Sequence, residues 1–246
     1  MAKTLVVANW KMNPPTLREA KKLLEATKKA ARKAKHVSVV VAPPSVFLRA
    51  LSKGERAIVF GVQRASGEDG GAYTGEISMK QAKDAGASIA IIGHSESRAA
   101  GETNDDIRKQ VAAALTARMT PIVCVGEKER EASGEHFNVV AEQLRVGLTD
   151  VPAAKLSRVA IAYEPVWAIG GERTMSPRDM HEMAIFIRKT MVESHGDTGH
   201  KVKILYGGSA NEENAAPMIE GGDVSGLLVG HVSVDAPRFA ALLSSL

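Results

Sequence analysis

Cysteine is almost absent from the chain. Cys124 is the only one among the 246 residues. A single thiol can neither form a disulfide within the chain nor complete a CxxC site, which excludes a disulfide-stapled fold and favours a reducing compartment. Because no histidine lies near Cys124 in the sequence, we expect it to pack in the core rather than to act as a nucleophile.

Aromatic residues and long apolar runs are also scarce. Aromatics make up 4% of the chain, and no apolar run is long enough for a transmembrane helix. The apolar stretch near the N-terminus is too short for the core of a signal peptide. The 32 basic and 28 acidic residues leave a mildly basic chain, and the densest basic run, 28–36, has no aromatics among it, which favours a solvated helix face. We therefore expect a cytoplasmic protein with no nucleic-acid or membrane partner.

Short apolar runs recur along the chain. Most are apolar throughout, which is typical of strands covered on both faces in a parallel sheet. The runs lie at 5–8, 37–42, 57–61, 88–92, 120–125, 159–163, 202–206 and 225–229. At roughly 100 to 200 residues per domain, the length alone allows one domain or two.

Helical patterns separate these runs. They lie at 16–32, 78–85, 105–117, 135–148, 176–193, 212–219 and 235–243. Ser176 before Pro177 is typical of a helix start, and Gly86 of a helix end. The alternation predicts an α/β protein with a closed (β/α)8 barrel, the TIM barrel, formed by residues 1–246 as a single domain. An open doubly wound sheet is the alternative, but the usual GxGxxG after the first strand is absent.

Polar and glycine residues follow several of the predicted strands, where β/α barrels place their active sites. They are Asn9 and Lys11 after the first run, His94 after the fourth, Glu164 after the sixth, Gly207, Gly208 and Ser209 after the seventh, and Gly230 and His231 after the eighth. Each alone has an ordinary explanation as a solvated, capping or turn residue. Their coincidence at one rim favours a site.

These side chains suit proton abstraction next to a carbonyl group. Glu164 can act as the base, a neutral His94 can donate a hydrogen bond to the carbonyl oxygen, and the Lys11 ammonium can stabilise the developing negative charge. The glycine turns after the seventh and eighth strands can present backbone N–H groups to a phosphate. No HxxxH motif, second cysteine or spaced pair of carboxylates indicates a metal site, so we expect no metal.

Six segments carry a resemblance to a known family. They are ANWKMN at 8–13, GAYTGEIS at 71–78, IIGHSE at 91–96, PIVCVGE at 121–127, AYEPVWAIG at 162–170 and LYGGSAN at 205–211. With these motifs the chain resembles the triosephosphate isomerases from end to end. The resemblance implies the interconversion of dihydroxyacetone phosphate and D-glyceraldehyde 3-phosphate through an enediolate, in glycolysis and gluconeogenesis, with no metal or organic cofactor. Another phosphosugar isomerase or synthase, and a non-catalytic binding protein, are the alternatives.

The resemblance also implies roles for single residues. Glu164 would shuttle the proton, His94 would be the electrophile, and Lys11 with Asn9 would bind substrate and stabilise the intermediate. Segment 165–174 would be a lid over the phosphate, which Gly170, Ser209, Gly230 and His231 would bind.

The family is commonly a homodimer, and the resemblance implies that loop 63–76 enters the partner's barrel mouth, with Thr74 beside the partner's Asn9 and Lys11. Several positions depart from the usual family sequence, among them Arg64, Gly171, Glu172 and His231. We expect Glu172 to face solvent in the closed lid, because like charges repel near a phosphate. For His231 a backbone N–H contact is favoured, and contact by its imidazole is left open.

Overall fold

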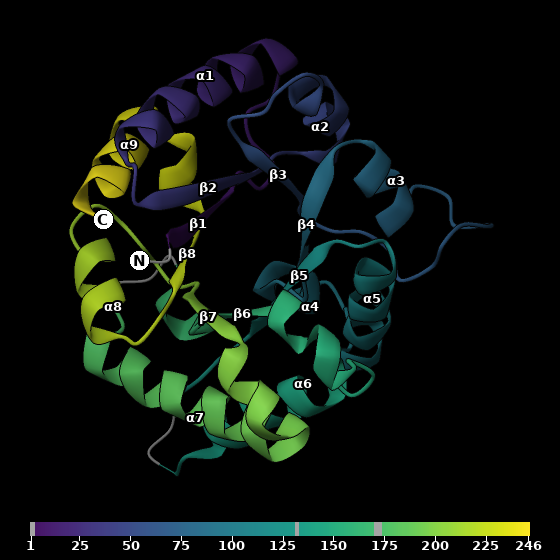
Figure 1. Cartoon of the computed structure of the whole chain (residues 1–246), viewed down its shortest axis with the longest axis vertical. Helices are drawn as coiled ribbons and strands as arrows, with labels where there is room; N and C mark the ends of the chain where they lie inside the picture. The colour runs from purple at the N-terminus through teal and green to yellow at the C-terminus, as the bar shows by residue number, and fades with distance from the viewer. Residues whose placement is uncertain (1–2, 131–132, 170–173) are drawn as a thin grey trace.

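Parallel strands form a closed barrel at the centre of the molecule (Figure 1). The computed structural model describes residues 3–130, 133–169 and 174–246. Within these residues, eight strands pair in chain order and β8 returns to β1. They are β1 (Thr4–Asn9), β2 (Val37–Ala42), β3 (Val59–Val62), β4 (Ala87–Ile92), β5 (Thr120–Val125), β6 (Ala160–Tyr163), β7 (Lys203–Tyr206) and β8 (Gly226–Val229). The predicted (β/α)8 barrel is confirmed.

Closure of the barrel depends on a close approach of β8 to β1. Leu5 stands opposite Gly226 in the register of these two strands. A Cβ atom added to Gly226 would lie 2.0 Å from the carbonyl oxygen of Leu5. Any larger residue at position 226 would therefore clash with the β1 backbone. Glycine at this position lets β8 pair with β1 and close the barrel.

Helices cover the outside of the barrel. They are α1 (Leu17–Lys33), α2 (Ser45–Ser52), α3 (Met79–Asp84), α4 (Ser95–Ala99), α5 (Asn104–Thr116), α6 (Glu135–Gly147), α7 (Pro177–His195), α8 (Ala215–Gly221) and α9 (Ala236–Ser245). The Ser176 hydroxyl caps α7 by accepting from the Asp179 backbone N–H, as the sequence predicts. The helical patterns did not indicate α2 and α4, which have eight and five residues. In the described residues, no helix is long and apolar enough to cross a membrane.

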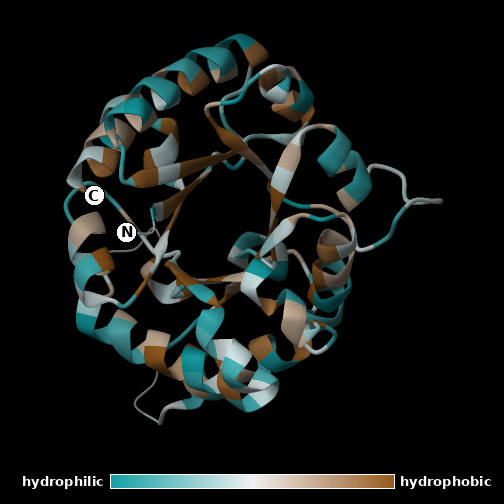
Figure 2. Ribbon diagram, viewed as in Figure 1, coloured by the Kyte–Doolittle hydropathy of each residue, from teal (hydrophilic) through white to brown (hydrophobic). Residues whose placement is uncertain are grey.

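Two apolar clusters explain why the strands are apolar on both faces. Between strands and helices lies the larger one, which includes Val6, Val39 and Val123. Inside the barrel, a smaller cluster includes Val7, Val40, Ile91, Ile122, Cys124, Leu205 and Leu228. The ribbon coloured by hydropathy shows the same arrangement, with brown strands inside and teal on the outer helices (Figure 2). Cys124 is fully buried, as expected, and burial raises the pKa of its thiol well above the ordinary value.

Candidate active site

The predicted site residues meet in a cavity of about 310 Å³ at the carboxyl ends of the strands. Its walls include Asn9, Lys11, His94, Glu164, Ser209, Gly230 and His231. These residues come from distant parts of the chain, and barrel closure brings them together. Gly170 and Glu172 lie outside the described residues.

Glu164 lies directly after β6 and is 2% exposed. One carboxylate oxygen, Oε2, accepts a hydrogen bond from the Ser95 backbone N–H at 2.8 Å. Within the described residues the other oxygen, Oε1, accepts no hydrogen bond, although it lies 3.3 Å from His94 Nε2. The carboxylate is thus anchored through one oxygen, and the other keeps a lone pair free to take a proton.

His94 is the N-cap residue of α4. Its Nδ1 atom accepts a hydrogen bond from the Glu96 backbone N–H at 3.2 Å. Because an accepting ring nitrogen carries no proton, the proton of the neutral imidazole is on Nε2. His94 therefore presents an N–H donor to the Glu164 side of the cavity, as a carbonyl electrophile requires.

Lys11 adopts a left-handed backbone conformation, with a φ of 52°, which is uncommon for residues other than glycine. Its N–H donates to Asn9 Oδ1 at 3.1 Å. Gln63 Nε2 donates to the carbonyl oxygens of Lys11 and Ala42, both at 2.8 Å. Sequence patterns did not indicate this role for Gln63. These contacts hold the Lys11 backbone so that its side chain reaches the cavity.

The Lys11 ammonium forms an ion pair with Glu96, with 2.6 Å between Nζ and Oε1. Burial alone would raise the pKa of Glu96, but the hydrogen bond and charge of Lys11 outweigh it, so this pKa lies below its ordinary value. The Lys11 side chain also lies close to Gly230, because a Cβ atom added to Gly230 would be 3.2 Å from Lys11 Cε. Lys11 therefore lies between Glu96 and the turn after β8.

The turns after β7 and β8 line the other side of the cavity. The Ser209 hydroxyl donates to the Ala168 carbonyl at 2.7 Å, which links the turn after β7 to the start of segment 165–174. After β8, the Ser233 hydroxyl donates to the Gly230 carbonyl at 2.6 Å. The two predicted phosphate turns are thus held at the same edge of the barrel as Lys11.

The buried Glu127 side chain anchors the start of segment 165–174 through hydrogen bonds. It is 1% exposed and accepts hydrogen bonds from the Tyr163 hydroxyl at 2.8 Å and from Trp167 Nε1 at 2.7 Å. Burial and the Glu127 charge raise the pKa of Tyr163, which keeps its hydroxyl a donor. Sequence patterns did not indicate a role for Glu127, although it closes the PIVCVGE motif.

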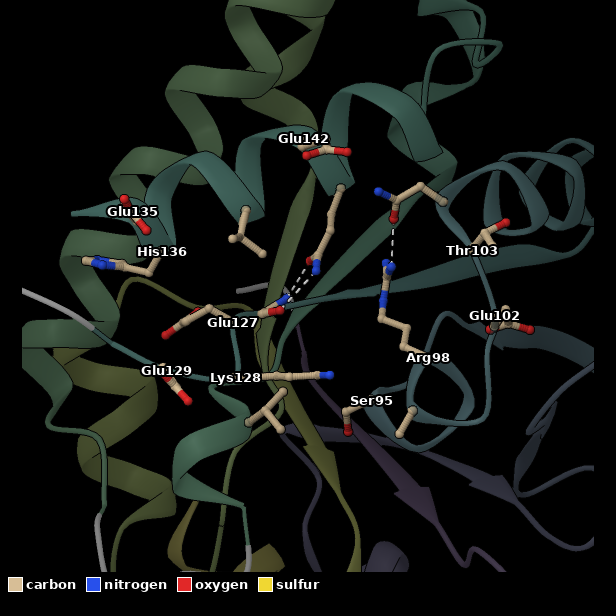
Figure 3. Close-up of a pocket in the computed structure, with 16 residues that line it drawn as sticks. Ser95, Arg98, Glu102, Thr103, Glu127, Lys128, Glu129, Glu135, His136 and Glu142 are labelled. Atoms are coloured by element: carbon tan, nitrogen blue, oxygen red, sulfur yellow. Dashed lines mark hydrogen bonds between the residues drawn. The ribbon is translucent and has the colours of Figure 1, made fainter. Parts of the chain in front are cut away.

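Figure 3 shows a larger cavity, of about 690 Å³. Lys11, His94 and Glu164 are not among its lining residues. Along its wall, Gln143 bonds both backbone groups of Gly126, at 2.7 and 3.0 Å. Arg98 Nη1 donates to Asn104 Oδ1 at 2.7 Å. These contacts fix the loops that support Glu164, whereas Lys11, His94 and Glu164 line the smaller cavity.

Two glycines leave the space that Glu164 occupies. A Cβ atom on Gly126 would lie 1.8 Å from the Glu164 carbonyl oxygen, and one on Gly207 would lie 2.8 Å from Glu164 Cγ. The first contact involves backbone, whereas the second involves the Glu164 side chain. Gly207 therefore controls where the carboxylate lies.

We expect Gly207→Ala to lower kcat by about 100-fold, because a displacement of the order of 1 Å costs that much in a reacting group. The thermal midpoint should fall only modestly, since the side chain can move away. Steady-state kinetics and thermal unfolding measure the two effects. Gly147→Ala, at the last position of α6 and outside the cavity lining, where an added Cβ meets only the Ile107 side chain at 3.3 Å, is the matched control. A kcat equal to that of the control would contradict the steric role of Gly207.

The fold and the site together define a barrel enzyme suited to moving a proton beside a carbonyl group. The sequence profile of triosephosphate isomerase matches residues 4–246. Over 249 residues the chain is 42% identical to the triosephosphate isomerase of Endomicrobium trichonymphae, covering 99% of this chain and 98% of the relative. It is 40% identical to that of Moorella thermoacetica, with 99% of each chain covered. The chain belongs to the triosephosphate isomerase family.

Proposed function

We propose that this chain interconverts dihydroxyacetone phosphate and D-glyceraldehyde 3-phosphate, as a step of glycolysis and gluconeogenesis. The observation that carries the proposal is the Glu164 carboxylate, with one oxygen anchored by Ser95 and the other free beside His94. Membership of the triosephosphate isomerase family supports the choice of substrate.

The proposed reaction moves one proton between neighbouring carbons. Glu164 Oε1 takes the proton from the carbon next to the carbonyl, while His94 Nε2–H donates a hydrogen bond to the carbonyl oxygen. The electron pair of the broken C–H bond forms the enediolate, whose negative charge the Lys11 ammonium stabilises. The hydroxyl proton must move as well, so His94 gives its Nε2 proton to the former carbonyl oxygen and takes the hydroxyl proton from the neighbouring oxygen. The protonated Glu164 then returns its proton to the adjacent carbon, where the C=C electron pair forms the new C–H bond and the neighbouring C–O⁻ becomes the new carbonyl group. Each step uses a side-chain group of the chain itself.

The phosphate group would occupy the side of the cavity formed by Ser209, Gly230 and His231, with Asn9 beside Lys11. Gly170, from the segment outside the described residues, is proposed to add a backbone N–H. Closure of lid 165–174 would exclude water from the enediolate. The contact between Ser209 and Ala168 supports this arrangement, because it joins the phosphate turn to the lid's first residues.

A substrate panel tests the choice of reaction. We expect rapid conversion of glyceraldehyde 3-phosphate in a coupled assay and none of larger phosphosugars, which a cavity of about 310 Å³ would hold poorly once the lid closes. Preference for a larger phosphosugar would favour another phosphosugar isomerase or synthase. Binding of a phosphoglycolate analogue without turnover would favour a non-catalytic protein.

We also propose that residues 1–246 act as one domain and that the protein is cytoplasmic. Support for the first statement comes from the pairing of β1 with β8, which joins the two ends of the chain in one barrel. The second is supported by Cys124, which cannot form a disulfide within the chain.

We further propose a homodimer formed through the loop that contains Thr74. Residues 68–76 are exposed throughout, and the segment between β3 and α3 projects outward from the barrel at the right of Figure 1. Tyr73 is 50% exposed within this loop, and Met12, next to Lys11, is 92% exposed. Apolar surface at both the loop and the barrel mouth is what two self-complementary subunits would bury.

We expect light scattering to give twice the mass of one chain for the wild type and the mass of one chain for Thr74→Arg. A buried arginine without a partner would oppose association, and loss of the partner's loop beside Lys11 should lower kcat at least about tenfold. Ile185→Arg, at an exposed position of α7, is the control and should remain dimeric. A fully active wild-type monomer would contradict this assembly.

A further inference from the structure

His231 lies on the side of the cavity proposed for phosphate. It directly follows Gly230 after β8, is exposed, and lines the cavity together with Lys11 and Ser209. Among the described residues it shares no hydrogen bond or ion pair with any other side chain. Both ring nitrogens are therefore free to meet a ligand.

The other cationic side chains on this side of the cavity, Lys11 and Arg238, already have carboxylate partners. Lys11, after β1, pairs with Glu96 at 2.6 Å. From α9, Arg238 lines the same cavity, and Glu212, after β7, holds its guanidinium through two bonds of 2.9 and 3.1 Å.

The other titratable groups close to His231 and Arg238 also have interaction partners. Glu164 and His94 face each other, and Asp235 caps α9 by accepting from the Arg238 backbone N–H. Among the described residues that line this cavity, His231 is thus the one that can bring a positive charge not already matched by a carboxylate.

We propose that the protonated His231 imidazole binds the substrate's phosphate group directly, so that affinity for the phosphate rises as the pH falls. This inference rests on the proposed function, because it needs the phosphate at the β7 and β8 turns. It extends the expectation from the sequence, which favoured the backbone N–H alone.

Protonation and anion binding reinforce each other at such a site. Histidine is the side chain whose charge changes most readily near neutral pH. A charged donor forms a shorter and stronger hydrogen bond to a phosphate oxygen than a neutral one does. The substrate's own phosphate also changes charge near pH 6, which would mask the effect, whereas sulfate keeps two negative charges throughout this range.

Calorimetric titration with sulfate, from about pH 5.5 to about pH 8.5, separates the two effects. The proteins to compare are the wild type, His231→Asn, which keeps an N–H donor but does not titrate, and His200→Asn, an exposed histidine in the 3-10 helix Gly196–Lys201. We expect the ratio of sulfate affinities, wild type over His231→Asn, to rise about tenfold from the alkaline to the acidic end. The ratio of wild type to His200→Asn should stay constant.

Enzyme kinetics give a second readout. The KM ratio of His231→Asn to the wild type for glyceraldehyde 3-phosphate should rise as the pH falls, with little change in the kcat ratio, because the contact is to the non-reacting end of the substrate. A sulfate-affinity ratio that does not vary with pH would overturn the inference, while isomerase activity would still support the proposed function. Failure of sulfate to bind the wild type at any pH would overturn the phosphate position and the inference with it.

Discussion

Glu164→Gln is expected to lower kcat by about 10²- to 10⁴-fold, the range that a general base contributes. The amide oxygen can still accept from the Ser95 N–H, as Oε2 does now at 2.8 Å. An amide has no basic lone pair, however, so the proton on the substrate carbon has no acceptor. KM should change little, since the phosphate contacts remain, and single-turnover kinetics would place the loss in the chemical step.

Glu164→Asp is the matched control for this result. It keeps the charge and basicity of the carboxylate but shortens the side chain, so it should retain more activity than Glu164→Gln. A loss of about 100-fold is expected from the displacement. Thermal unfolding of both variants shows whether each is folded. A folded Glu164→Gln with more than a tenth of the wild-type kcat would rule out Glu164 as the base.

Lys11→Met is expected to lower kcat/KM by about 10²- to 10³-fold, the cost of removing one preorganised group that stabilises an oxyanion. Methionine keeps most of the side-chain length and leaves the backbone contacts of Lys11 with Asn9 and Gln63 in place. Lys11→Arg restores the charge and should recover part of the activity. If Lys11→Met had a kcat/KM within threefold of the wild type, the ammonium would have no part in stabilising the enediolate.

The same substitution has a consequence for stability in acid. Because the folded protein holds the pKa of Glu96 below its ordinary 4.5, the Lys11–Glu96 pair stabilises the fold above that value. This contribution is lost as the pH falls through the lowered pKa. Lys11→Met removes the partner, so its unfolding free energy should depend less on pH between about pH 5 and pH 3. Because Glu96 is largely exposed, we expect the difference to be small.

Much of the fold follows from residue patterns within single segments. The predicted bounds of β2 and β5 match the structure, because both strands are apolar on two faces and end abruptly at polar or turn residues. Short helices such as α4, with five residues, cannot be predicted in this way. Their stability comes from the loops they bridge rather than from an amphipathic repeat.

The site is only partly predictable for a similar reason. Lys11, His94 and Glu164 could be located because each lies within two residues of the end of a strand. Gln63 could not, since its hydrogen bond to Lys11 joins residues 52 positions apart. The pairing of Arg238 with Glu212, on the same side of the cavity as His231, likewise depends on α9 reaching the turn after β7.

The central proposal is proton transfer by a side-chain base through an enediolate. It is tested most directly by incubating the wild-type protein with D-glyceraldehyde 3-phosphate in D₂O and following the products by proton NMR. We expect dihydroxyacetone phosphate to form, with solvent deuterium in part of the product at the carbon that gains hydrogen, because the proton on Glu164 can exchange with solvent before it is returned. Conversion without any deuterium at that carbon, or no conversion by folded protein, would contradict the mechanism.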